Sequence, residues 1–187
     1  MKMQAFVSLS CSSVLLTAGV AAFGQAAGEA SAADKHFVHE ALMGGMAEVQ
    51  LGQIASQKAA GQDVKQFGQK MVEDHTKTGD QMKGVASQIG VPAPAALSPE
   101  DQALKTRLEG LSGAQFDRAY IRAMVKDHQA DLQAFQGEAA SGNSQAVKDA
   151  ASQGANVVSH HLEMIKQIAT AHHVTVNSDE ASAKSGR

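Results

Sequence analysis

The chain has 187 residues, of which 43% are hydrophobic and 19% charged, a composition typical of one folded domain rather than a disordered chain. Its formal net charge is −3, and its Lys and Arg residues form no cluster, which excludes the electrostatic surface that nucleic acid requires. The one cysteine, Cys11, forms no disulfide within the chain and would leave with a cleaved leader.

Residues 1–24 have the pattern of a secretory signal peptide, with Lys2 before an uncharged stretch that ends in small residues. We expect cleavage near residue 24, or as late as residue 32, and a flexible lead-in over residues 25–33. An uncleaved membrane anchor is an alternative, which the serines, threonine and glycine in the stretch disfavour. A lipoprotein anchor at Cys11 is a second alternative, but the apolar segment mostly follows that residue. No later stretch is apolar and long enough to span a bilayer, so the mature chain is expected to have no transmembrane helix.

Four long segments carry apolar residues at the three-and-four spacing of an amphipathic helix. Their ranges are 34–60, 64–89, 113–141 and 144–173. Asp34 is the expected N-cap of the first helix. Ser112 and Gln115 form an expected capping box at the third. The small polar residues of 174–187 predict a disordered tail.

The second and third long segments are separated by a linker with all three prolines of the chain. Within it, Ser98 and Pro99 have the pattern of a helix start and predict a short helix that reaches Glu109. The sequence therefore predicts an all-α domain over residues 34–173, a four-helix bundle with a short extra helix in this linker. The linker is long enough to cap one end of the bundle or to cross its length, so the topology stays open.

Each long helix places one ionisable residue among its inward positions. These residues are Glu48, His75, His128 and His161. Buried ionisable groups are costly unless they are paired or bound to metal, and three imidazoles with one carboxylate suit zinc, copper or iron. Asp74 and Asp127 point about 100° away from the adjacent histidines and are expected to orient a histidine of another helix, with Tyr120 near the same layer. The alternative is a metal-free buried hydrogen-bond network of the same residues.

The heights of these residues along the bundle can be compared by counting from the turns. Glu48 precedes the first turn, near residue 61, by 13 residues, and His75 follows it by 14, which places them level. His128 and His161 lie 14 and 19 residues from the last turn, near residue 142. That difference corresponds to an axial offset of roughly 7 Å.

The sequence is compatible with three functions: a non-enzymatic metal-binding bundle, a metal-free structural or stress-related envelope protein, and a redox or peroxide-handling metalloenzyme. No Glu is followed three residues later by His, so the Glu-x-x-His pairs of diiron bundles are missing. The remaining histidines near the helix ends are expected at the surface. They are His36, His39, His172 and His173.

Five short segments of the chain together form a characteristic set of motifs. They are Glu-Val-Gln-Leu-Gly at residues 48–52, Met-Val-Glu-Asp-His at 71–75, Leu-Ser-Gly-Ala-Gln-Phe-Asp-Arg-Ala-Tyr at 111–120, Asp-His at 127–128 and His-Leu at 161–162. The set resembles a bacterial family of exported ferritin-like proteins catalogued as a domain of unknown function and often labelled outer-membrane or membrane proteins. The resemblance implies a ferritin-like bundle in a periplasmic or outer-membrane-associated protein, and no established activity. Residues 124–128 also distantly resemble the Met-x-x-His-His helix of another ferritin-like family linked to copper, with Asp127 in place of the first histidine.

Overall fold

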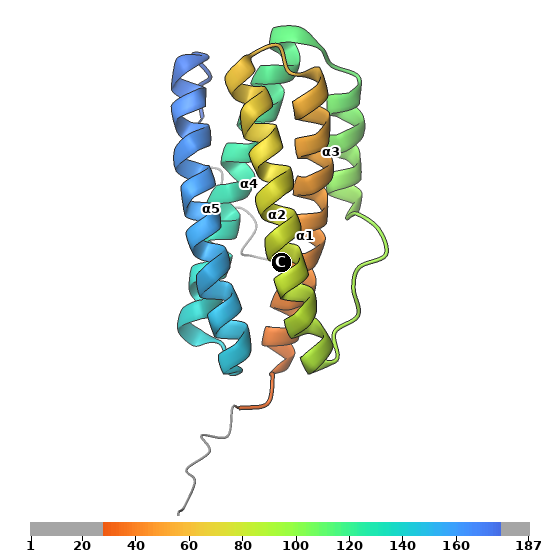
Figure 1. Ribbon diagram of the computed structural model, residues 1–187, viewed down its shortest axis with the longest axis vertical. Helices are drawn as coiled ribbons and strands as arrows, with labels where there is room; N and C mark the ends of the chain where they lie inside the picture. The colour runs from red at the N-terminus through yellow and green to blue at the C-terminus, as the bar shows by residue number, and fades with distance from the viewer. Residues whose placement is uncertain (1–27, 177–187) are drawn as a thin grey trace, which may run out of the picture.

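The computed structural model describes residues 28–176, and this part of the chain is helical with connecting turns and loops (Figure 1). The helices are α1 (Ala32–Lys58), α2 (Gln62–Ile89), α3 (Pro99–Glu109), α4 (Gly113–Ser141) and α5 (Gln145–Ala171). The predicted fold class is confirmed, since four long helices form a bundle and α3 lies in the predicted linker. Among these helices none has the length and apolar character to cross a membrane. The predicted signal peptide lies outside the described residues.

The linker crosses the length of the bundle. Figure 1 shows α1 and α5 running upward and α2 and α4 running downward, while the segment with α3 carries the chain from the lower end of α2 to the upper end of α4. Helix α1 packs along α2, α4 packs along α5, and the two hairpins meet through α2 with α5 and α1 with α4. Each long helix is therefore antiparallel to the two long helices beside which it packs.

Asp34 joins the start of α1 to the α4–α5 turn at the lower end of the bundle, and its predicted role as N-cap is wrong. Ser31 is the N-cap, and Asp34 completes a capping box from the third helical position, so α1 begins two residues earlier, within the expected lead-in. The buried Asp34 carboxylate also accepts the backbone N–H groups of Asn143 at 2.9 Å and Ser144 at 3.1 Å. Burial acts to raise the pKa of Asp34, but these backbone donors outweigh it and lower the pKa to about 2.

At the upper end of the bundle, Asp117 likewise joins a helix to a distant turn. Its two carboxylate oxygens accept the backbone N–H groups of Ala60 at 2.9 Å and Gly61 at 2.8 Å, which ties the α1–α2 turn to the N-terminal part of α4. The expected capping box at Ser112 is wrong, because its side chain makes no cap hydrogen bond. The N-terminal end of α4 is thus stabilised by a contact with a distant turn.

The C-terminal end of α5 also lies at the upper end of the bundle. His172 lies 2.9 Å from an Asp63 carboxylate oxygen at the start of α2, while His36 and His39 belong to the lower part of α1. His172 therefore lies at the opposite end of the bundle from His36 and His39. Val174 is buried against the core, so the chain stays packed beyond the expected boundary at residue 173.

The apolar interior is divided into two parts by a polar layer. The upper core contains, among others, Leu51, Ala55, Phe67, Met71, Phe116, Tyr120, Met124 and Ile165. The lower core contains Val38, Leu42, Met82, Ala86 and Val147. In the upper part the backbones of α1 and α2 approach closely. A Cβ added at Gly52 would lie only 2.7 Å from the carbonyl oxygen of Gly68, so the absence of a side chain at Gly52 permits this approach. The two cores pack the helices together on either side of the layer between them.

Candidate metal centre

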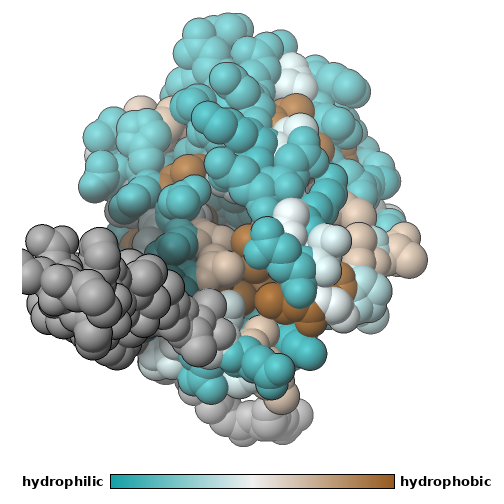
Figure 2. All heavy atoms as spheres, turned by 60° about the horizontal axis from the view of Figure 1, so that its bottom comes forward, coloured by the Kyte–Doolittle hydropathy of each residue, from teal (hydrophilic) through white to brown (hydrophobic). Residues whose placement is uncertain are grey.

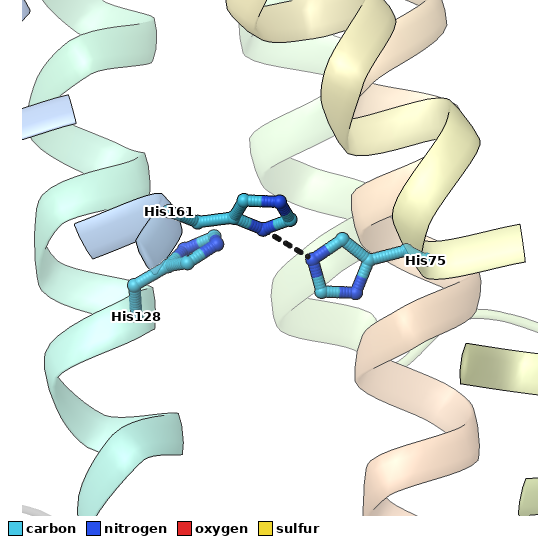
Figure 3. A group of neighbouring side chains, drawn as sticks. All are labelled: His75, His128 and His161. Atoms are coloured by element: carbon cyan, nitrogen blue, oxygen red, sulfur yellow. Dashed lines mark hydrogen bonds between the residues drawn. The ribbon is translucent and has the colours of Figure 1, made fainter. Parts of the chain in front are cut away.

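The polar layer contains the four residues that the sequence places inward, one from each long helix. Relative exposures are 2% for Glu48, 6% for His75 and 0% for both His128 and His161. We call these four residues the Glu/His layer. The three imidazoles converge from α2, α4 and α5 (Figure 3), and each offers a ring nitrogen within 4.8 Å of the others. The structure therefore brings the predicted residues together.

A chain of hydrogen bonds fixes the protons of two histidines. The Asp74 carboxylate, which also pairs with Lys70 at 2.9 Å, lies 2.7 Å from Nε2 of His161. A carboxylate is an acceptor, so this nitrogen carries the proton and Nδ1 of His161 has the lone pair. That lone pair lies 3.1 Å from Nε2 of His75, which therefore donates (Figure 3). Asp74 orients a histidine of another helix, as its direction on α2 predicts.

His128 is oriented by its own helix. Its Nδ1 lies 3.0 Å from the carbonyl oxygen of Met124, which can only accept, so Nδ1 carries the proton and Nε2 has the lone pair. Nε2 of His128 points to Oε1 of Glu48 at 3.4 Å. Both atoms are buried, and neither has a hydrogen-bond partner among the described residues. A buried polar atom without a partner is costly, and here two such atoms face each other.

Burial keeps the layer close to neutral. Desolvation lowers the pKa of His75 and of His161 to about 4, and it holds the pKa of His128 well below its usual range. Desolvation also raises the pKa of Glu48 to about 8, with a further contribution from the negative charge of Asp101. Neutral imidazole is the form that binds metal, so three ligands are ready at neutral pH.

Glu48 lies between two imidazole lone pairs. Its Oε2 is 2.8 Å from Nδ1 of His75, which has no proton because Nε2 of the same ring donates to His161. The other lone pair belongs to His128. One proton on the Glu48 carboxyl satisfies one of these two nitrogens and leaves the other without a donor. A bound cation removes this conflict.

The distances and outer contacts suit a transition metal. Two nitrogens bound tetrahedrally to one zinc ion lie about 3.3 Å apart, and Nε2 of His75 and Nδ1 of His161 already lie at 3.1 Å. The far nitrogen of every histidine faces an acceptor. These acceptors are Glu48 for His75, Asp74 for His161 and the Met124 carbonyl for His128. Such outer acceptors fix ring orientation and raise ligand basicity in metal sites.

The two other residues named from the sequence differ in position. Asp127 offers a carboxylate oxygen within 4.8 Å of ligand atoms of Glu48 and His128, which makes a second possible cation group. Tyr120 stacks on Phe116 with ring centroids 5.8 Å apart, and its buried hydroxyl finds no hydrogen-bond partner in residues 28–176. Tyr120 is therefore packed in the upper core, and an outer role at the centre stays a prediction.

The fold and this layer define a helical bundle with a candidate transition-metal centre. The chain belongs to the family described as "Domain of unknown function (DUF4142)", whose model matches residues 20–168. This confirms the expected membership of a family without assigned function. No curated protein sequence matches the chain.

Several solved structures share the fold. A DUF305 fragment from Deinococcus radiodurans has a TM-score of 0.68 and 17% identity, covering 76% of this chain and 98% of that one. A DUF305 protein from Streptomyces coelicolor, described as secreted, has a TM-score of 0.67 and 13% identity, covering 79% and 97%. CopM in its Cu(I)-bound form has a TM-score of 0.60 and 20% identity, covering 74% and 96%. At these identities the likeness shows the fold alone.

Proposed function

We propose that this protein is an exported, non-enzymatic bundle that binds one transition-metal ion through His75, His128 and His161. Glu48 accepts from His75 and offers its second oxygen to the ion. The observation that carries the proposal is the pair of unpartnered buried atoms, Oε1 of Glu48 and Nε2 of His128, which face each other at 3.4 Å. A cation bound between them gives both atoms a partner.

The chemistry of the donors narrows the metal. Imidazole ligands suit zinc, copper and iron, and the mature chain would supply no thiolate. CopM, which has the same fold, has been crystallised with Cu(I) and with silver. These two ions therefore join Zn(II) and Fe(II) as the first to test. Export is supported by the leader pattern and by the description of the Streptomyces coelicolor protein as secreted.

Metal analysis of the purified protein tests this function. The protein is loaded with each ion in turn, passed through a desalting column and measured for bound metal per chain. The expected result is close to one ion for the wild type and a loss of at least tenfold in affinity for His161→Ala. His160→Ala is the matched control, because His160 is exposed on the same helix, and it should bind as the wild type does. Equal binding by both variants would contradict the proposal.

A metal-free structural role is the second candidate, and one observation favours it. A continuous series of hydrogen-bonding contacts runs through Lys70, Asp74, His161, His75 and Glu48. Such a network can serve to hold α1, α2 and α5 in register. This role predicts that neither added metal nor chelator changes the unfolding temperature, whereas a ligand of the native state raises it.

A further inference from the structure

A cavity of about 570 Å³ lies beside and below the Glu/His layer. Residues of all five helices line it, from Phe37 on α1 to Val158 on α5. Figure 2 shows the lower end of the bundle, where apolar surface is visible between hydrophilic side chains. The cavity reaches Glu48 and His75, so it connects the layer with the outside of the bundle.

Apart from Glu48, which is neutral at pH 7, the acidic residues give the cavity wall charge of one sign. Its acidic residues are Glu40, Glu48, Glu100, Asp101, Asp127 and Asp131, and no Lys or Arg appears among the described residues that line it. Burial increases from Glu40 and Glu100, which are exposed, through half-buried Asp101 to buried Glu48. Apolar residues such as Met82 and Phe135 form other parts of the wall.

The inner end of the cavity points to a cation. Glu48 is 2% exposed, and its unpartnered Oε1 belongs to a residue of the cavity wall. Asp127, also on the wall, places a carboxylate oxygen within 4.8 Å of ligand atoms of Glu48 and His128. This oxygen-rich group shares His128 with the three-histidine group. The two groups are therefore adjacent.

Acidic residues on a wall with apolar parts concentrate cations. Field lines are focused in such a cleft, and the rate of cation entry rises by about 10- to 1,000-fold at low ionic strength. The field of the wall reaches the inner end, because the charge of Asp101 contributes to the raised pKa of Glu48. A hydrated metal ion is small relative to the cavity and can enter with its water.

We infer that this cavity is the loading route of the metal centre, and that Asp127 takes the incoming hydrated cation together with Glu48 and passes it to the three histidines. The inference rests on the proposed function. It assigns a transfer role to Asp127, which is no ligand of the loaded centre. It also separates the rate of metal binding from its equilibrium affinity.

Charge variants test the route by stopped-flow loading with aqueous Zn²⁺ or Ag⁺, whichever the wild type retains. Glu100→Gln/Asp131→Asn and, separately, Asp127→Asn should slow loading at least tenfold at low salt, with about one ion still bound at equilibrium. Asp80→Asn/Glu163→Gln removes two exposed acids outside the cavity and should change the rate less than twofold. Loss of bound ion in Asp127→Asn would show a resident ligand and overturn the transfer role.

A steric variant tests the route without changing charge. Gly79 lines the cavity, and a Cβ added there meets no atom within 4 Å, so Gly79→Leu places a side chain in the path. Gly84→Leu is the control, because Gly84 has the same free space on the same helix but lies outside the cavity wall. The expected result is slow loading in the first variant alone.

The outcomes separate this inference from the function on which it rests. Normal retention of metal with wild-type rates in Gly79→Leu and in the charge variants overturns the loading route alone. A wild-type protein that retains none of the ions overturns the proposed function and the route with it.

Discussion

Oε1 of Glu48 and Nε2 of His128 lie 3.4 Å apart, and neither has a hydrogen-bond partner among the described residues. Nδ1 of His128 donates to the Met124 carbonyl, so the facing nitrogen has a lone pair. Two acceptors in contact require a proton or a cation between them.

Glu48→Gln supplies a permanent donor at this point. The amide N–H₂ can donate to the lone pair of His75 or His128, and the neutral side chain removes the cost of burying a charge. We expect the metal-free variant to be more stable than the wild type at pH 9, by about 1–3 kcal/mol in urea unfolding. We also expect metal affinity to fall at least tenfold. A variant with lower stability and unchanged affinity would contradict the assignment of Glu48.

Metal loading should release a proton. Without metal, Glu48 is protonated below its pKa of about 8, and Nε2 of His75 donates to His161. When Nε2 of His75 binds the ion, its proton moves to Nδ1 and is donated to an ionised Glu48. We therefore expect release of about one proton per ion at pH 7 and much less above pH 9. Titration calorimetry in buffers of different ionisation enthalpy measures this number, and a value that does not change with pH would argue against it.

The stability of the metal-free protein should pass through a maximum between pH 6 and 7. The lowered pKa values of His75 and His161, about 4, give stability that is complete above pH 6.5 and is lost as pH falls toward 4. The raised pKa of Glu48 acts in the opposite direction, with stability complete below pH 4.5 and lost as pH rises toward 8. Unfolding temperatures from pH 4 to 9 check this shape. In Glu48→Gln the decline on the alkaline side should become smaller.

The buried carboxylate of Asp117 should matter for the fold and not for the metal. Asp117→Ala removes the acceptor for the N–H groups of Ala60 and Gly61 and is expected to cost about 2–4 kcal/mol in chemical unfolding. Metal affinity, measured under conditions in which the variant is fully folded, should stay within twofold of the wild type. Asp149→Ala, at an exposed position of α5, is the control and should cost less than about 0.5 kcal/mol. Equal losses in both variants would show that the turn contact contributes little.

Most of the Glu/His layer can be predicted from the sequence. Helical periodicity identifies its inward residues, and counting from the turns gives their heights along the bundle. A short turn joins α1 and α2, so counting from it places Glu48 and His75 level, and Nδ1 of His75 lies 2.8 Å from the carboxylate. For His128 and His161 the same counting gives an axial offset, but their ring centroids lie only 5.6 Å apart. Helical rise describes backbone height and does not include the direction of long side chains.

Contacts between residues far apart in the sequence cannot be predicted in the same way. The partners of Asp117 are 56 and 57 residues away, and nothing in its local pattern distinguishes it from a surface acid. The sequence places Asp34 at the start of α1, though not in its correct capping position, and its contact with the α4–α5 turn depends on the topology. That topology was undetermined, because the linker is long enough for either arrangement. Hydrophobic patterns therefore predict faces of helices, and the tertiary structure decides which ends meet.

X-ray absorption spectroscopy of the metal-loaded protein identifies the ligands of the bound ion. We expect one ion with three imidazole nitrogens at about 2.0–2.1 Å for zinc, and a smaller imidazole contribution in His161→Ala but not in His160→Ala. A spectrum with a sulfur ligand, or with oxygen ligands and no imidazole, would contradict the assignment of the centre to His75, His128 and His161.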